Sequence, residues 1–352
     1  MTGKNKKILL LVGNWKWDIY EEALARGFSA AGWDVIPFRT VEFLPQGRLL
    51  SQLRRLRTKW TCKDLNLALL HKVKEFRPDM IIFVRCDEIL PETLKLIRAV
   101  SPASFLISYH NDNPFIGTIR RFSMRQYRAS LAIVDLVLVY RPGDIPLASK
   151  EGAKRIEVLL PSFIRDLHKP TQGSEANDVI YIGHFENDGR EEILHILHDA
   201  DIQVRVYGTG WEKAQSRKPW LEKQNIHQVW GTEYAALLSN AKIALVFFSA
   251  RNRDVYTRRC FEIPACGSLM MAPRTKELEQ LFKDGEEAVF WDSTDDLVSK
   301  VKYYLANETE RKIIATAGRA KLLHGGFDEY AQAHKIVNLY ESHFFVNAAN
   351  LK

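Results

Sequence analysis

Residues 243–272 read IALVFFSARNRDVYTRRCFEIPACGSLMMA, and they decide which fold this chain can adopt. They begin with an apolar run at 243–248, pass through a charged segment, and end with a second apolar run at 268–272. Apolar runs without polar alternation are typical of strands in a parallel sheet that is covered on both faces. The charged segment between them predicts a crossover helix whose first turn lies near residues 255–257.

The same alternation of short apolar runs and helical stretches extends along the chain in both directions. In the C-terminal half, three further strands are predicted at 179–182, 204–207 and 288–291. In the N-terminal half, the predicted strands are 8–12, 34–38, 80–84, 105–109, 136–140 and 156–160, and the predicted helices are 20–31, 65–76, 92–100 and 120–133. This order predicts an α/β protein with two Rossmann-like, doubly wound domains.

The domain boundaries follow from a polar, turn-rich segment at 165–177 that interrupts the alternation. We predict an N-terminal domain at 1–164, a linker at 165–177 and a C-terminal domain at 178–325. The remainder, 326–352, contains apolar residues at helical spacing, so we expect a helix that packs back across the N-terminal domain. A chain of 352 residues is long enough for each domain to bury its own core.

Composition narrows the class of protein. A net charge of +7 favours an anionic partner, which could be a phosphorylated small molecule, a nucleic acid or an anionic membrane surface. No apolar run approaches the roughly 18 residues of a membrane span, so we expect a cytoplasmic protein that could work at the inner face of the membrane. The four cysteines show no metal-binding spacing, which predicts reduced structural thiols: Cys62, Cys86, Cys260 and Cys266.

Ligands of open α/β sheets bind beyond the carboxyl ends of the strands, so the residues after each apolar run are informative. Gly183 follows the strand at 179–182, and Arg190 opens the next helix, where it could meet an anion. Gly208 follows the strand at 204–207, in a segment that lacks the third glycine and the acidic residue of an NAD site. We therefore reject NAD and expect close approach of another nucleotide.

The charged segment at 251–262 carries the strongest signal. A helix N-terminus exposes unpaired amides and the positive end of the helix dipole, and four arginines surround the one predicted here. Asp254 and Glu262 lie eight residues apart at the two ends of this helix and could face one ligand. The alternative is a solvated, charged helix, but the arginines and carboxylates favour a phosphate site.

A fourth candidate place follows the strand at 105–109, where His110 precedes Asn111-Asp112-Asn113. Polar side chains at a strand end are candidates for sugar contact or proton transfer. One carboxylate is a poor ligand set for a divalent ion, so this motif does not predict a metal site. A simple turn capped by Asp112 is the alternative to a catalytic role.

Several ordered motifs between residues 178 and 337 resemble the glycosyltransferase domain of the spore maturation protein CgeB-like family, which is related to the retaining family 4 GT-B glycosyltransferases. The first half resembles the family more loosely, at 77–79 and 111–114. The motifs of the second half are Val179-Ile180-Tyr181-Ile182-Gly183, Tyr207-Gly208-Thr209-Gly210-Trp211, RCFEIPACG at 259–267, FKDGEEA at 282–288, YYLA at 303–306 and Ala317-Gly318-Arg319.

This resemblance implies a GT-B glycosyltransferase with an interdomain cleft and a nucleotide-diphosphate-sugar donor. It implies that Glu262 holds the nucleotide ribose and that Asp254, where the family usually has glutamate, reaches the donor sugar. It places His110 against the donor sugar and matches Arg190 to a basic position of the family. Amides near Tyr256 and Thr257, with Arg259 or Arg253, would then neutralise the diphosphate.

The resemblance also implies retention of anomeric configuration, and the arginines and the helix end would stabilise the leaving group without a metal or another cofactor. The acceptor, which we expect in the N-terminal half, could be a glycan, a lipid-linked molecule or a protein. A basic, leucine-rich stretch at 47–60 could gather a lipid-linked acceptor at an anionic membrane, or it could be an ordinary helix facing the core.

The sequence alone leaves other functions open as alternatives. The same fold could serve a non-catalytic scaffold that binds a nucleotide sugar, or an epimerase or phosphorylase, although no acid–base set or cofactor lysine for the latter is evident. Nucleic acid is not an expected partner, because the basic residues lack an aromatic platform or a recognised motif.

Overall fold

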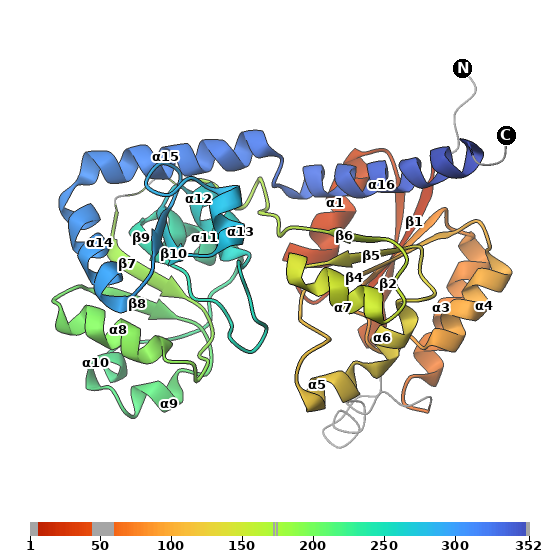
Figure 1. The fold of residues 1–352 in the computed structure, drawn as a ribbon, viewed down its shortest axis with the longest axis horizontal. Helices are drawn as coiled ribbons and strands as arrows, with labels where there is room; N and C mark the ends of the chain where they lie inside the picture. Colours follow the sequence, from red (N-terminus) through yellow and green to blue (C-terminus); the bar gives the residue numbers. More distant parts are fainter. Residues whose placement is uncertain (1–5, 44–59, 172, 174, 350–352) are drawn as a thin grey trace. The chain divides into compact units, whose positions relative to one another are not determined.

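The computed structural model describes residues 6–43, 60–171, 173 and 175–349, and it divides into two compact units (Figure 1). Unit 1 contains the residues up to 160 together with those from 329 onward, and unit 2 contains residues 161–328. The segment 165–177, expected to be a linker, is part of unit 2, where the Ile164 amide donates to His168 Nδ1 and Arg311 pairs with Glu175. Most of the basic stretch at 47–60 lies outside the described residues.

Unit 1 is built on a six-stranded parallel sheet of order β2-β1-β3-β4-β5-β6. Its strands are β1 (Ile8–Gly13), β2 (Asp34–Arg39), β3 (Met80–Val84), β4 (Phe105–His110), β5 (Leu136–Val139) and β6 (Ile156–Val158). Its helices are η1 (Asp18–Glu22), α1 (Ala23–Ala30), η2 (Thr40–Phe43), α3 (Lys63–Phe76), α4 (Pro91–Val100), α5 (Thr118–Ser123), α6 (Arg125–Ser130), η3 (Pro142–Asp144), α7 (Ile145–Lys150) and α16 (Glu329–Ala349).

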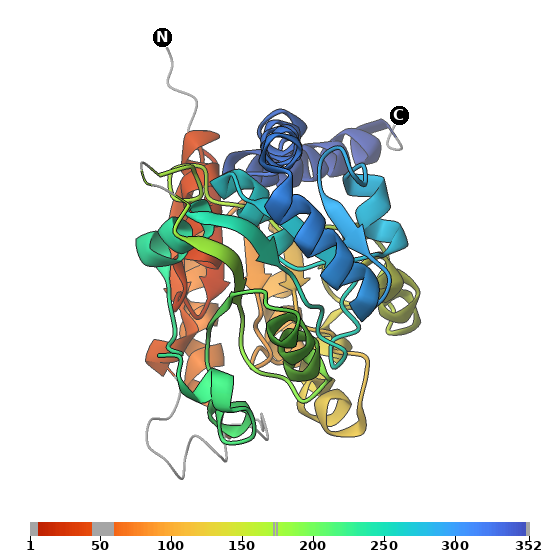
Figure 2. The ribbon, with the colours of Figure 1, turned by 90° about the vertical axis from the view of Figure 1, so that its left-hand side faces the viewer.

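Unit 2 is built on a five-stranded parallel sheet of order β11-β10-β9-β7-β8 (Figure 2). Its strands are β7 (Asn177–Ile182), β8 (Val204–Tyr207), β9 (Ala241–Leu245), β10 (Leu269–Pro273) and β11 (Val289–Trp291). Its helices are α8 (Arg190–Asp199), α9 (Glu212–Gln215), α10 (Pro219–Glu222), α11 (Gly231–Ser239), α12 (Arg259–Cys266), α13 (Lys276–Leu281), α14 (Thr294–Ala306) and α15 (Glu308–Gly325).

These two parallel sheets confirm the predicted α/β fold. Every apolar run predicted as a strand contains one, because strands such as β3 are buried along their whole length and need apolar side chains on both faces. The helix predicted at 120–133 is wrong in one respect, since it divides into α5 and α6. The division falls at Met124, whose φ of −97° and ψ of 16° depart from helical values.

The start of α12 corrects a second expectation. The helix begins at Arg259 and not near residues 255–257. Residues 249–254 form a tight turn in which the amides of Asn252 and Asp254 donate to the Ser249 carbonyl. The Val255 carbonyl then accepts a hydrogen bond from the Thr275 hydroxyl at 2.8 Å, outside the helix.

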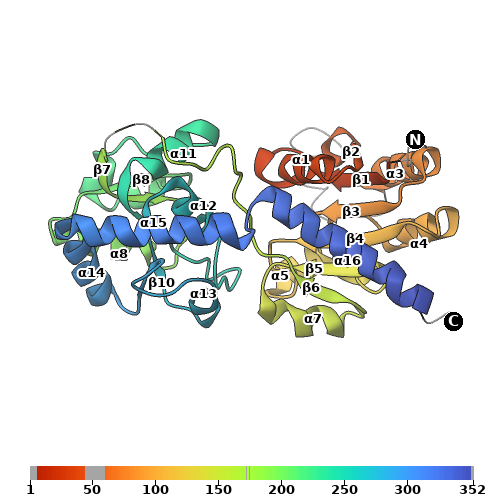
Figure 3. The ribbon, with the colours of Figure 1, turned by 90° about the horizontal axis from the view of Figure 1, so that it is seen from above.

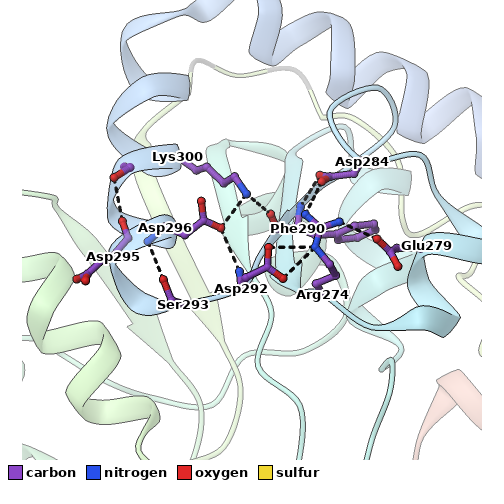
Figure 4. Close-up of polar contacts among 10 residues, drawn as sticks. Arg274, Glu279, Asp284, Phe290, Asp292, Ser293, Asp295, Asp296 and Lys300 are labelled. Carbon is purple, nitrogen blue, oxygen red and sulfur yellow. Dashed lines mark hydrogen bonds and ion pairs between the residues drawn. The ribbon is translucent and has the colours of Figure 1, made fainter.

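A single guanidinium ties together the loops after β10 and β11 (Figure 4). Arg274 follows β10 and donates to Glu279 at 2.8 Å, Asp284 at 2.7 Å and Asp292 at 2.9 Å. Asp284 also accepts the Phe290 amide of β11 at 2.9 Å. This network holds the edge strand β11 against the sheet, although its partial exposure limits what each pair contributes to stability.

The last described helix, α16, packs on α1 and crosses unit 1 (Figure 3). Gly27 of α1 is buried at this contact, and a Cβ atom there would lie 2.4 Å from the Glu329 carbonyl oxygen and 2.7 Å from Ala333 Cβ. Arg155 adds hydrogen bonds to the Leu339 carbonyl and the Ser342 hydroxyl. The two helices therefore approach so closely that only glycine fits at position 27.

We expect Gly27→Ala to destabilise unit 1 by about 1–3 kcal/mol, because the added methyl group meets backbone that cannot move freely. Helix propensity alone predicts the opposite sign, since alanine favours a helix over glycine by about 1 kcal/mol. Urea unfolding of the full chain measures the difference. Ser29→Ala, at an exposed position of the same helix, is the control and should change stability little; a stabilised Gly27→Ala variant would contradict the close packing.

Candidate active site

Two glycines meet where β7 and β8 end in unit 2. The Gly183 amide donates to the Tyr207 carbonyl at 2.9 Å, and Gly208 has a φ of 135°, which side chains rarely adopt. A Cβ atom on Gly208 would lie 2.1 Å from the Gly183 carbonyl oxygen. The neighbouring turn therefore requires glycine at 208, whatever ligand the site binds.

Gly183 lies directly beside the guanidinium of Arg259. A Cβ atom on Gly183 would lie 2.4 Å from the Tyr181 hydroxyl and 3.0 Å from Arg259 Nη2. Burial lowers the pKa of Arg259, but nearby Tyr181, Tyr234 and Glu262 outweigh burial and the pKa stays above its ordinary value. The guanidinium is therefore charged, and it makes no hydrogen bond or ion pair with any other residue in the described part of the chain.

Arg190, by contrast, is fully engaged within the protein. It opens α8, is buried, and forms a two-point ion pair with Asp188, with Nε and Nη2 at 2.8 and 2.6 Å from the two carboxylate oxygens. Its Nη1 donates to the Tyr181 hydroxyl at 2.9 Å and to the His184 carbonyl at 2.8 Å. Arg190 thus positions the turn after β7, and its charge is balanced by Asp188.

His184 borders the same turn and carries little charge at neutral pH. Burial lowers the pKa of His184, and the charges of Arg259 and Arg190 lower it further, although Glu186 acts in the opposite direction. Its Nε2 lies 3.0 Å from Glu186, which also accepts a hydrogen bond from Ser249 at 2.8 Å. Glu186 therefore connects the turn after β7 to the turn after β9.

The entry to α12 presents polar groups beside Arg259. Tyr256 and Thr257 are buried, and the Thr257 hydroxyl has no hydrogen-bond partner among the described residues. The Cys260 amide donates to the Thr257 carbonyl at 3.1 Å, so the amides that precede Cys260 lie at the positive end of the helix dipole. This end of α12 has the amide groups and dipole that suit an anion, and it begins later in the chain than the predicted helix start.

Glu262 lies inside α12, only 5% exposed. Its oxygens accept hydrogen bonds from Tyr234 at 2.6 Å and from Arg258 Nε at 3.0 Å, and His168 Nε2 lies 4.0 Å away. Burial raises the pKa of Glu262, but Arg258, His168 and the Tyr234 hydroxyl together lower it below the ordinary value of 4.5. Glu262 is therefore ionised at neutral pH and held in one orientation.

Asp254 and Arg253 lie on the loop before α12, so the expectation that Asp254 sits at the end of this helix is wrong. The Ser249 carbonyl accepts the Asp254 amide at 3.1 Å, which closes the turn after β9. Arg253 is exposed and has a left-handed φ of 53°, which is rare for a residue with a side chain. The turn places both side chains on the connection between β9 and α12.

His110, the last residue of β4, lies in unit 1 and is buried. Its Nε2 is 3.0 Å from Asp87, and its Nδ1 accepts the Asp112 amide at 3.1 Å, so both ring nitrogens have protein partners. Asn113 donates to Asp144 at 3.0 Å. The Asn111-Asp112-Asn113 segment is thus shaped by contacts within unit 1.

Nine of the ten residues singled out in the sequence lie in unit 2, and only His110 lies in unit 1. The structure brings Gly183, Arg190 and Arg259 together around the Tyr181 hydroxyl. Sequence reasoning missed Tyr181, Tyr234 and His168. Tyr181 was hidden inside an apolar strand, and the other two reach Glu262 from distant segments, so no local pattern could have indicated them.

Comparison with known proteins supports one class of activity. Residues 190–336 match the family described as glycosyl transferase-like. Sucrose-phosphate synthase from Thermosynechococcus elongatus is similar in structure, with a TM-score of 0.70 and 14% identity over 97% of this chain and 100% of that one.

Two further solved structures are similar at the level of the fold. HepE from Anabaena, in complex with UDP-glucose, has a TM-score of 0.65 and 14% identity over 96% of this chain and 99% of that one. A glycosyltransferase from Rickettsia africae has a TM-score of 0.68 and 13% identity over the same shares. No curated protein matches the chain by sequence.

The chain has the GT-B fold and is a glycosyltransferase enzyme. The family match covers most of unit 2, including α8, α12 and the turn that precedes α12. None of the helices in the described ranges has the length and apolar content needed to cross a bilayer.

The depressed pKa of Glu262 predicts how acid affects stability. A carboxylate whose pKa is lowered by folding stabilises the fold above its ordinary pKa and loses that contribution as the pH falls through the folded-state value. We expect the stability difference between the wild type and Glu262→Gln to be constant between about pH 6 and 8 and to shrink below pH 4.5.

Urea unfolding of the full chain across this pH range measures the difference. Glu222→Gln, at an exposed position of unit 2, is the control and should show no such trend. A wild-type advantage that grows as the solution becomes acidic would contradict the lowered pKa.

Proposed function

We propose that this glycosyltransferase takes its sugar from a nucleoside-diphosphate donor held by unit 2, and that it retains the anomeric configuration without a metal ion. The observation that carries the proposal is the charged Arg259 guanidinium, which has no anionic hydrogen-bond partner in the described part of the chain. A half-buried charge without a hydrogen-bond partner is costly, and a bound diphosphate would supply a partner.

Three features of the site suit a diphosphate. Arg259 offers a planar donor set that matches phosphate oxygens. The amides around Thr257 lie at the positive end of α12, and the Thr257 hydroxyl is available as a further donor. Gly183 leaves space beside the guanidinium, because a Cβ atom there would lie 2.4 Å from the Tyr181 hydroxyl and 3.0 Å from Arg259 Nη2. Arg253 lies on the connection before α12 and could add a second cation, and Gly208 keeps the adjoining strand end compact.

The two acidic residues have different roles in this proposal. Glu262 binds the ribose, since a carboxylate has about four acceptor positions and its two protein donors leave room for hydroxyl groups. Asp254 reaches the donor sugar from the loop before the helix. Tyr234 and Arg258 fix the Glu262 carboxylate before the donor arrives, which lowers the entropy cost of binding.

In this proposal, catalysis depends mainly on stabilising the negative charge of the diphosphate leaving group. Cleavage of the bond between the anomeric carbon and the phosphate oxygen places positive charge on the sugar and negative charge on the diphosphate. Arg259 and the amide end of α12 stabilise that negative charge as it develops. The resemblance to retaining enzymes supports retention, and the HepE structure with UDP-glucose makes UDP-glucose the first donor to test.

The acceptor in this proposal binds to unit 1, where His110 is a positioning residue. Because its two nitrogens hold Asp87 and the Asp112 amide, His110 shapes the end of β4 and acts on the sugar through these neighbours. Placement within the CgeB-like branch and action beside an anionic membrane also belong to the proposal. They are supported by the motifs at 259–267 and by the net charge of +7, respectively.

Removal of the unpartnered guanidinium tests the donor site. We expect Arg259→Gln to weaken UDP-glucose binding by about 10- to 100-fold, the loss typical of a charge-assisted hydrogen bond. Isothermal titration calorimetry measures the affinity. Arg205→Gln removes an exposed arginine of β8 and should leave the affinity unchanged. Equal affinities of Arg259→Gln and the wild type would overturn the proposed diphosphate site.

Truncation of the two carboxylates separates binding from turnover. We expect Glu262→Ala to abolish the thermal shift caused by UDP-glucose, because ribose binding contributes to affinity for the whole nucleotide. Asp254→Ala should keep the shift but slow donor hydrolysis by about 10-fold or more, because it contacts the reacting sugar. Donor affinity at the wild-type level in Glu262→Ala would contradict the ribose assignment.

A further inference from the structure

Buried polar atoms without partners gather at the carboxyl edge of the unit 1 sheet. Twelve buried side-chain nitrogen or oxygen atoms of the described residues lack a hydrogen-bond partner. Four of the twelve belong to residues that follow the neighbouring strands β1, β3 and β4: Trp15 Nε1, Glu21 Oε2, Arg85 Nε and Asn111 Oδ1. Since nearly all buried polar groups in proteins are satisfied, this concentration at one edge indicates a ligand site.

Hydrogen bonds and a ring contact connect several residues at this edge. Asn111 Nδ2 donates to the Tyr20 hydroxyl at 3.0 Å, and the Arg85 guanidinium lies 5.1 Å from the centre of the Tyr20 ring. Glu21 is 1% exposed, and its Oε1 accepts the Asn14 amide at 3.0 Å. A Cβ atom on Gly13 would lie 2.2 Å from the same oxygen, so the glycine at the end of β1 makes room for this carboxyl group.

The backbone at this edge is strained. Trp15 and Arg85 each have a φ of 54°, in the left-handed region that disfavours residues with side chains. Such conformations are energetically costly and are concentrated at binding sites, where they aim side chains at a ligand. Both strained residues carry one of the buried atoms without a partner.

The charges at this edge do not favour an anion or a metal ion. Arg85 interacts with the carboxyl groups of Asp112, Glu21 and Asp87, and Asp112 also interacts with Arg120, so no excess positive charge is left to attract an anion. Within the described ranges, no group of three or more histidine, cysteine or acidic side chains is arranged to hold a metal ion. The remaining class is an uncharged molecule that can both donate and accept several hydrogen bonds.

We propose that this edge of unit 1, through Glu21, Arg85 and Asn111, binds an uncharged sugar and that this sugar is the acceptor. Vicinal hydroxyl groups donate and accept hydrogen bonds, as the four buried atoms require, and the apolar face of a sugar can pack on the half-buried rings of Trp15 and Tyr20. A lone hydroxyl group of a lipid or a protein side chain would satisfy only one or two of these atoms. The inference rests on the proposed function, to which it adds the class of acceptor.

The test measures binding of simple glycosides to the full chain. We expect at least one of methyl α-D-glucoside, methyl α-D-mannoside and methyl β-D-galactoside to bind, as seen by saturation-transfer NMR, and to bind more tightly than methyl β-D-glucuronide, which carries a negative charge. Asn111→Ala and Glu21→Gln should each weaken binding by about three- to tenfold, the loss expected for one hydrogen bond. Glu22→Gln makes the same chemical change one residue away and should bind like the wild type.

Two results would overturn the inference: no binding of any neutral glycoside to the wild type, or unchanged binding in both Asn111→Ala and Glu21→Gln. Titration of the same samples with UDP-glucose reports separately on unit 2. Donor binding that persists in the variants shows that they are folded. A wild type that binds a glycoside but not UDP-glucose would contradict the proposed donor and leave the sugar site of unit 1 intact.

Discussion

The candidate donor site of unit 2 depends on the close packing of side chains at the end of β7. A Cβ atom on Gly183 would lie 2.4 Å from the Tyr181 hydroxyl and 3.0 Å from Arg259 Nη2, so a side chain there would have to displace these groups. Tyr181 is in turn held by Arg190, whose own charge is balanced by Asp188. Arg190 is thus paired within the protein, whereas the Arg259 guanidinium keeps its donors unused, and this difference is why we propose Arg259 as the anion-binding residue.

The strands were predictable from the sequence because a parallel sheet covered on both faces demands uninterrupted apolar runs, and β1, β3 and β4 have them. The start of α12 was not predictable. A turn closed on the Ser249 carbonyl precedes it, and the Val255 carbonyl accepts a hydrogen bond from Thr275, twenty residues away, which no local pattern encodes. The apolar strands on either side of this segment were therefore predicted, while the backbone geometry between them was not.

The contacts of individual side chains were also not predictable from the sequence. The sequence indicated Glu262, but it could not indicate that Tyr234 and Arg258 occupy two of its acceptor positions. It indicated His110 as a sugar contact, but the partners of both ring nitrogens come from Asp87 and the Asp112 backbone. Residue type and strand position could be predicted, whereas the direction of each polar group depends on neighbours that are distant in sequence.

The return of α16 to unit 1 makes unit 2 an insertion within the first unit. During synthesis, unit 2 emerges as one continuous segment and can fold before α16 exists. The part of α16 that packs on Gly27 of α1 is synthesised about three hundred residues after Gly27. Until then the α1 surface around Gly27 stays uncovered. An exchange of unit 2 between related enzymes would accordingly need two chain junctions, one on each side of the inserted segment.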